Sequence, residues 1–290
     1  MKILIADQAG FCTGVHRAIK LAERAIAQQP VRSLGPLIHN VQEVERLKKK
    51  GIIFTEEEIP NRDRETDEAV LIRSHGVGPQ VMAALEQAGW PMIDATCPYV
   101  KKAQKLAAEA AAEGYQVIIL GDQEHAEVKG LQEWAGGKAI VVSSAEELKG
   151  IALTPPVALL AQTTEREARF DEAAEYLRNA TAEPKIHKTI CKATEQRQKA
   201  AGELAGQVDL MLVVGGRHSS NTTKLWEICQ SVNKNSRLIE EAKEIDRAWL
   251  KNINSVGITA GASTPAWIIK EVVMSIEENK EQEQSLEQME

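Results

Sequence analysis

Cysteine is scarce in this chain, with four in 290 residues. Four cysteines are too few for the disulfide framework of a small secreted domain, so we expect them to be reduced. Basic residues are also in deficit, because 35 Lys and Arg stand against 42 Asp and Glu, for a net charge of −7. A general nucleic-acid-binding protein usually has a basic face. We therefore expect no nucleic-acid partner.

Long hydrophobic runs are missing too. No apolar run approaches the roughly 18 residues of a membrane-spanning helix, so we expect no membrane partner. The opening segment MKILIADQ is typical of a short buried strand that ends at Asp7 and not of a secretory signal. The expected location is therefore the cytoplasm. The sequence also has no G-x-x-x-x-G-K-[ST] and no G-x-G-x-x-G before a helix, which disfavours a P-loop and a dinucleotide site.

Short apolar runs alternate with helix-like segments along the whole chain. The runs are rich in β-branched residues, and the segments between them are rich in Ala, Glu and Lys. The apolar runs are KILIA, AVLIRS, QVIILG, AIVVS, VALLAQ, LMLVVGG and SVGITAG. Such alternation predicts an α/β fold with mainly parallel sheets.

Three of the four cysteines recur in one sequence context, each directly before a helix-like segment. They are Cys12, Cys97 and Cys191. A polar residue follows each of them at a distance of 27 or 28 residues, in order His39, His125 and Ser219. Another polar residue comes after a later apolar run of each repeat, in order His75, Thr163 and Ser263. This spacing indicates an internal repeat of roughly ninety residues.

The repeat predicts three similar small α/β lobes followed by a tail. The expected ranges are 1–96, 97–190 and 191–280, with a charged tail at 281–290. Open α/β sheets bind ligands at the carboxyl ends of their strands, where the polar residues of the repeat are expected. A pseudo-threefold (trefoil) arrangement of the lobes would bring these ends to one central site. Regular spacing is also common in α/β proteins, so chance similarity is the alternative.

Single cysteines from three lobes suit a particular kind of metal centre. Structural zinc sites usually use close pairs such as C-x-x-C, and the sequence has none. Three separate thiols suit a soft centre such as a 4Fe–4S cluster, whose fourth iron would then stay open to substrate. Helix N-termini would stabilise the thiolates. Cys229 lies on an apolar helical face and is interpreted as a buried, inert thiol.

A set of polar residues surrounds the expected centre. His125 and Glu127, two residues apart, are expected on one side of an extended segment, and Glu127 is a candidate proton donor. The segment GGRHSSNTTKL is typical of an anion site at a helix N-terminus, and TAGAST repeats the pattern. Ser, Asn and Thr clusters are also ordinary helix caps, so that alternative stays open. His39 and His75 add donors that suit phosphate groups.

These motifs occur in order over nearly the whole chain, as GFCTGV, GPLIHN, SHGV, DATCP, HAEV, QTT, ICKAT, SSN and TAGAS. The set resembles the 4-hydroxy-3-methylbut-2-enyl diphosphate reductase family of the methylerythritol phosphate route to isoprenoids. The resemblance implies three α/β lobes around an iron–sulfur cluster. It also implies reductive removal of the substrate hydroxyl to give isopentenyl and dimethylallyl diphosphate.

The resemblance also implies roles for single residues. The cluster ligands would be Cys12, Cys97 and Cys191. The diphosphate-binding residues would be His39, His75, His125, Ser219, Ser220, Asn221 and Ser263. Glu127 would supply the proton and Thr163 would complete its hydrogen-bond relay. The family usually has Pro between the His and Glu of HAEV, and Ala126 stands here.

The mechanism needs two electrons, which we expect to arrive singly from a ferredoxin or flavodoxin. Three other functions stay open at this point. An open-iron cluster could serve a hydro-lyase, which needs no external reductant. The chain could also be a non-catalytic iron–sulfur redox sensor or a zinc-binding module.

Overall fold

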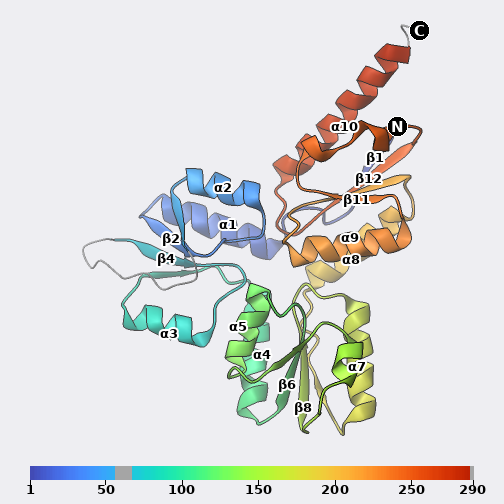
Figure 1. Ribbon diagram of the computed structural model, residues 1–290. Helices are drawn as coiled ribbons and strands as arrows, with labels where there is room; N and C mark the ends of the chain where they lie inside the picture. The colour runs from blue at the N-terminus through green and yellow to red at the C-terminus, as the bar shows by residue number, and fades with distance from the viewer. Residues whose placement is uncertain (56–66, 288–290) are drawn as a thin grey trace. The chain divides into compact units, whose positions relative to one another are not determined.

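The structure is a computed structural model that describes residues 1–55 and 67–287 (Figure 1). Its chain folds into two compact units. Unit 1 contains Met1–Cys12, His39–Glu43 and the chain from Lys192 onward, and unit 2 contains Thr13–Ile38 and Val44–Cys191. Among the described residues, every helix is too short or too polar to cross a lipid bilayer.

Unit 1 contains one four-stranded sheet, here called sheet A, with the strand order β1-β12-β10-β11. The strands are β1 (Lys2–Ile5), β10 (Leu210–Val214), β11 (Ser236–Ile239) and β12 (Ser255–Ala260). Its helices are α8 (Lys192–Ala205), α9 (Ser220–Val232) and α10 (Ala266–Glu287), with short 3₁₀ turns η1 (Ala242–Glu244) and η2 (Arg247–Leu250).

Unit 2 contains two further four-stranded sheets. Sheet B has the order β3-β2-β4-β5 and sheet C the order β7-β6-β8-β9. The strands of sheet B are β2 (Val31–Leu34), β3 (Ile52–Thr55), β4 (Ala69–Ile72) and β5 (Met92–Asp94). Those of sheet C are β6 (Gln116–Leu120), β7 (Ile140–Val142), β8 (Val157–Ala161) and β9 (Lys185–Ile186).

Helices connect the strands of sheets B and C. Those that precede or connect the strands of sheet B are α1 (Thr13–Ile26), α2 (Val41–Lys49) and α3 (Pro79–Gln87). Those around sheet C are α4 (Pro98–Ala112), α5 (Ala126–Trp134), α6 (Ala145–Lys149) and α7 (Glu167–Ala180). Every strand pairing described in the three sheets is parallel, so the predicted α/β class with three similar small sheets is confirmed.

Strand β8 of sheet C is apolar at every position, and the packing on its two faces explains why. Along β8, Val157 and Leu159 pack with α7 on one face, while Ala158 and Leu160 pack with α4 and α5 on the other. Figure 1 shows these helices on opposite sides of β6 and β8. Successive side chains of a strand alternate between faces, so a sheet covered on both sides needs apolar residues at every position. The buried run VALLA satisfies that condition.

Sheet A follows the same principle. Leu212 and Val214 of β10 pack against α10, and Met211 and Val213 pack against α8 and α9. The long run LMLVV is therefore buried on both faces. The parallel strands end at one edge of the sheet, and this edge holds the polar residues considered below.

Strand β1 belongs to sheet A, where Lys2–Ile5 pairs with β12 in the register Lys2 to Ser255. The predicted first lobe, residues 1–96, includes this strand, whereas the other strands of that range form sheet B. Each sheet thus has its cysteine after an edge strand, with Cys12 after β1, Cys97 after β5 and Cys191 after β9. The predicted lobe boundaries stay a prediction. The predicted tail begins within α10, which continues to Glu287, and residues 288–290 lie outside the described residues.

Candidate active site

The three repeat cysteines are bound to their sheets in the same way. The backbone N–H of each donates to a carbonyl two residues beyond the end of the neighbouring strand, β12, β4 or β8. The bonds are Cys12 to Ala262 at 3.2 Å, Cys97 to Ser74 at 2.9 Å and Cys191 to Thr163 at 3.0 Å. The turn after each strand therefore fixes one cysteine. We call these three segments the strand-end turns, residues 73–76, 162–164 and 261–264.

Each of these cysteines also stands at a helix N-terminus. Cys97 is the N-cap of α4, with Pro98 as the first helical residue, and Cys12 and Cys191 directly precede α1 and α8. Their side chains are half-buried, and the part of the chain that the structure describes contains no disulfide. The positive end of a helix dipole stabilises a thiolate, which is the form that binds metals.

Cys229 differs from the other three cysteines. It is fully buried in the apolar cluster between α8, α9 and sheet A. This burial agrees with its interpretation as an inert thiol. Burial disfavours the charged thiolate and raises the pKa of Cys229 to about 12. This thiol therefore stays protonated at neutral pH and is unsuited to metal binding.

Glu127 and Thr163 form a buried pair in unit 2. The backbone N–H of Thr163 donates to Glu127 Oε1 at 2.6 Å, and its hydroxyl donates to Oε2 at 2.8 Å. Glu127 is 2% exposed and Thr163 is 6% exposed. The carbonyl of Thr163 accepts the bond from Cys191, so one residue holds both the cysteine and the carboxylate.

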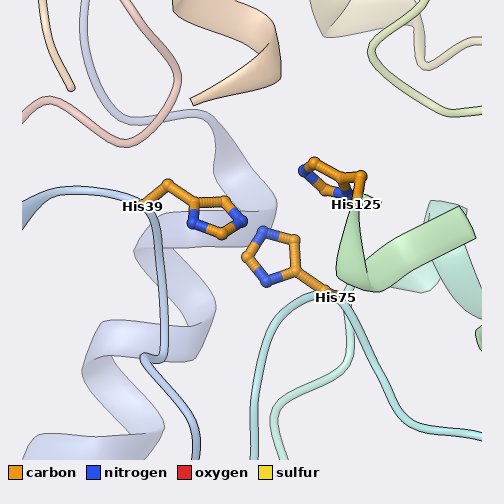
Figure 2. A group of neighbouring side chains, drawn as sticks. All are labelled: His39, His75 and His125. Atoms are coloured by element: carbon orange, nitrogen blue, oxygen red, sulfur yellow. The ribbon is translucent and has the colours of Figure 1, made fainter. Parts of the chain in front are cut away.

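His125 and His75 meet beside this pair. His125 is the N-cap of α5 and Glu127 is the second residue of that helix, so the expected extended segment is wrong. The His125 Nδ1 accepts a hydrogen bond from the Glu127 N–H at 3.1 Å. The imidazoles of His75 and His125 lie edge to face, with ring centroids 5.3 Å apart and an interplanar angle of 84°. Figure 2 shows these two side chains approaching from separate backbone segments. His39, also drawn there, belongs to unit 1.

Ala126 is the residue that departs from the family pattern, and it is the first residue of α5. A proline fits that position well, because the first helical N–H has no intrahelical partner. The preceding His125 has φ −73° and ψ 136°, a conformation that residues before proline favour. The backbone at His125 and Ala126 therefore already has the conformation that a proline at position 126 would require. Ala126 also lines a small cavity of about 50 Å³ together with Val77 and Val81.

Unit 1 holds a polar cluster at the carboxyl edge of sheet A. Ser219 is the N-cap of α9, and its hydroxyl accepts from the Thr222 N–H at 3.4 Å. Ser220 and Asn221 begin the helix. Both amide atoms of the Asn221 side chain, which is 4% exposed, have no hydrogen-bond partner among the described residues. A buried amide without partners is costly, and a bound polar ligand would satisfy it.

Ser263 lies in the strand-end turn of β12, in the same unit. Its hydroxyl donates to the backbone carbonyl of His39 at 3.0 Å. Asn40 follows His39 and accepts a bond from the Glu43 N–H at 2.8 Å, so it caps the start of α2. The His39 backbone is thus held between a helix cap and the strand-end turn of β12.

The structure places the sequence-predicted residues at strand ends. His39, His125 and Ser219 each lie five residues beyond β2, β6 or β10. His75, Thr163 and Ser263 lie in the strand-end turns. Unit 2 contains Cys97, Cys191, His75, His125, Glu127 and Thr163, all beyond the strand ends of sheets B and C, and unit 1 contains Cys12, His39, Ser219, Ser220, Asn221 and Ser263. The carbonyl acceptors of the cysteine N–H groups are not predictable from the sequence, because backbone acceptors leave no signal in residue type.

Comparison with known proteins agrees with these motifs. The LytB protein family matches residues 3–277. A relative from Wolinella succinogenes is 46% identical over 277 residues, covering 96% of this chain and 99% of its own. One from Caldanaerobacter subterraneus subsp. tengcongensis is 42% identical over 288 residues, covering 98% and 100%. Both are named 4-hydroxy-3-methylbut-2-enyl diphosphate reductase.

Solved structures match as well. The E-1-hydroxy-2-methyl-but-2-enyl-4-diphosphate reductase from Plasmodium falciparum superposes with a TM-score of 0.86 at 28% identity, covering 94% of this chain and 86% of that one. A solved (E)-4-hydroxy-3-methyl-but-2-enyl diphosphate reductase, the terminal enzyme of the non-mevalonate pathway, is 41% identical with a TM-score of 0.66, covering 96% and 100%. The chain therefore belongs to the LytB protein family, the 4-hydroxy-3-methylbut-2-enyl diphosphate reductase family that its motifs predicted.

Proposed function

We propose that the chain reduces 4-hydroxy-3-methylbut-2-enyl diphosphate to isopentenyl diphosphate and dimethylallyl diphosphate. The reaction takes two electrons and two protons. The allylic C–O bond breaks, one proton leaves with the hydroxyl as water, and the other adds to a carbon of the allyl fragment. The enzyme class predicted from the sequence is confirmed by relatives of the same name at 40–46% identity over nearly the whole chain.

Cys12, Cys97 and Cys191 are proposed to hold one 4Fe–4S cluster with its fourth iron open to substrate. Their thiols suit this group, because soft sulfur ligands select iron–sulfur clusters and helix N-termini stabilise both thiolates and cluster charge. When bound, the cluster would pass single electrons and supply a Lewis-acid position. The observation that carries the proposal is that all three cysteine N–H groups bond to strand-end turns that also contain predicted site residues.

The diphosphate is proposed to bind a shell of histidine, serine and asparagine side chains. Its members are His39, His75, His125, Ser219, Ser220, Asn221 and Ser263. An imidazole N–H can donate to a phosphate oxygen, and His125, whose Nδ1 accepts from the Glu127 N–H, would donate through Nε2. The N-terminus of α9 adds backbone donors and a favourable dipole. The buried amide of Asn221, without a partner among the described residues, supports a polar ligand at this place.

Glu127 is proposed to hold the proton that leaves with the hydroxyl. Thr163 fixes both carboxylate oxygens, so the orientation of the acid does not depend on substrate. A positioned carboxyl contributes about 10²- to 10⁴-fold to proton-transfer steps. The Thr163 carbonyl also accepts a hydrogen bond from the Cys191 N–H. Thr163 would therefore fix the position of the proton source, Glu127, relative to the cluster ligand, Cys191.

The electron donor is proposed to be a ferredoxin or flavodoxin, since each delivers electrons singly. The test is turnover of purified, anaerobically reconstituted protein with the substrate, with and without a reduced one-electron donor. We expect isopentenyl and dimethylallyl diphosphate to form only when the donor is present. Product formation without a donor would indicate the hydro-lyase alternative, and absence of substrate turnover with an intact cluster would indicate the redox sensor.

A further inference from the structure

Arg197 is a buried cation on helix α8. Its side chain is 1% exposed, and it is among the largest fully buried side chains of the described chain. A charged group is rarely buried this deeply unless strong hydrogen bonds compensate for the lost water. The hydrogen-bond partners of the guanidinium therefore indicate its role.

The guanidinium bonds two carbonyl groups of one loop. Nε of Arg197 donates to the Gln8 carbonyl at 2.9 Å, and Nη2 donates to the Gly10 carbonyl at 2.7 Å. Both carbonyls belong to the segment between β1 and α1, which ends in Cys12. We call residues 7–12 the Cys12 loop. Arg197 thus bonds the backbone directly before the thiol.

The Cys12 loop has a conformation that needs such support. Gln8 has φ 64° and Gly10 has φ 93°. The left-handed region is unfavourable for a residue with a side chain, so it persists only where surrounding contacts fix it. Alternating left-handed residues also turn the carbonyls of Gln8 and Gly10 toward one guanidinium.

The opposite edge of the loop is held by sheet A. The Gly10 N–H donates to the Ala260 carbonyl at 3.3 Å, and the Cys12 N–H donates to the Ala262 carbonyl at 3.2 Å. The N–H groups of Gly10 and Cys12 are therefore held at the end of β12 and just beyond it, while the carbonyls of Gln8 and Gly10 are held by Arg197. Removing either set leaves the loop attached on one side only.

We infer that Arg197 is a positioning residue for the Cys12 thiol. This inference rests on one part of the proposed function, namely that Cys12 is a ligand of the cluster. Arg197 holds the loop through these two backbone carbonyls, and its role is to fix the loop so that the sulfur is in place before iron arrives. A planar fork with two donors in fixed geometry suits two adjacent carbonyls, which a lysine cannot bond in the same way.

Arg17 shows the same arrangement at a second cysteine. Its Nη1 donates to the Thr96 carbonyl at 3.1 Å and its Nη2 to the Asp94 carbonyl at 3.2 Å, directly before Cys97. Arg17 is exposed, whereas Arg197 is buried. Water competes for exposed hydrogen bonds, so the effect of Arg17 on its cysteine should be the smaller of the two.

The experiment compares thiol reactivity in the metal-free protein. Arg197→Lys keeps the charge and loses the fork. Arg237→Lys is the matched control, because Arg237 also donates to two backbone carbonyls, of Lys234 and Ser236, in a segment without cysteine. The probe is iodoacetamide under anaerobic conditions, and mass spectrometry of peptides gives a separate alkylation rate for each cysteine.

We expect Arg197→Lys to raise the alkylation rate of Cys12 about tenfold, because losing a charge-assisted hydrogen bond makes local opening easier. The rates of Cys97 and Cys191 should be unchanged, and Arg237→Lys should change none of the three. An unchanged Cys12 rate would overturn the inference. An equal rise at all three cysteines would also overturn it, since that pattern means general destabilisation.

A second variant tests the loop with Arg197 present. A Cβ at Gly10 would lie 3.1 Å from Ile269 Cδ1 and 3.2 Å from the Thr264 carbonyl, in a left-handed conformation. Gly10→Ala should therefore also raise the Cys12 rate alone, and an unchanged rate would count against the loop as the determinant. Iron content of the reconstituted wild type is a separate readout. Its absence would refute the proposed cluster, while the thiol rates still test the positioning role.

Discussion

Replacing Glu127 by Gln tests the proton source with little change in structure. The carboxylate accepts from the Thr163 N–H through Oε1 and from the Thr163 hydroxyl through Oε2. In the variant, the amide oxygen can still accept from the N–H. The amide NH₂ can donate to the hydroxyl oxygen, because a hydroxyl both donates and accepts. Each of the two hydrogen bonds is therefore replaced by another in the variant, and the strand-end turn at residues 162–164 should keep its conformation.

The expected loss of turnover follows from the chemistry of the acid. An amide cannot deliver a proton, so the general-acid contribution of about 10²- to 10⁴-fold should disappear. That factor corresponds to about 2.7 to 5.4 kcal/mol of transition-state stabilisation. The cost in folding stability should be about 1 kcal/mol, the usual net value of one altered hydrogen bond, because both bonds to Thr163 have a replacement.

The assay is anaerobic steady-state turnover of the diphosphate substrate with a reduced dye as electron source. Visible absorption of the cluster is recorded for each variant. Glu124→Gln is the matched control, since Glu124 lies three residues earlier and its side chain forms an exposed ion pair with Lys129. It should retain turnover. Turnover of Glu127→Gln within about threefold of wild type, with an intact cluster, would remove Glu127 from the mechanism.

Further predictions concern the neighbouring residues. Thr163→Val should lower the free energy of unfolding in urea by about 1.5 to 3 kcal/mol, because a buried carboxylate loses a donor, whereas Thr163→Ser should cost less than half of that. Asn221→Ala should weaken inorganic pyrophosphate binding about tenfold in calorimetry without lowering the thermal midpoint, since its amide bonds no described residue. Cys229, with its pKa raised to about 12, should stay protonated and unreactive to iodoacetamide at pH 8, and Cys229→Ala should leave iron content unchanged. Ala126→Pro should keep turnover within about twofold and raise stability by about 0.4 to 1 kcal/mol, measured by urea unfolding.

Local patterns in the sequence were sufficient to predict the class of fold. Runs such as VALLA and LMLVV are apolar at every position, which only a strand covered on both faces requires. The spacing of polar residues was equally informative, since His39, His125 and Ser219 prove to lie at the same offset from their strands. Regular strand–helix repeats keep that offset constant, so a periodic motif translates directly into position.

Two features of the structure could not be predicted from local sequence patterns. The pairing of Lys2–Ile5 with β12 joins residues about 250 positions apart, and nothing in MKILIADQ specifies its partner. Arg197 lies in the segment TEQRQKAAGEL, which has the composition of an exposed helix, yet it is 1% exposed. Its burial depends on two backbone carbonyls of a distant loop, and backbone acceptors carry no signature in residue type.

The most direct test of the proposed centre is Mössbauer spectroscopy with iron and sulfide analysis of anaerobically reconstituted protein. The account predicts four irons and four sulfides per chain, with one iron whose spectrum differs from the other three and changes when the diphosphate substrate is added. Replacing Cys12, Cys97 or Cys191 by Ser should each abolish that spectrum, while replacing Cys229 should not. Four equivalent irons, or a cluster that survives loss of one of the three cysteines unchanged, would contradict it.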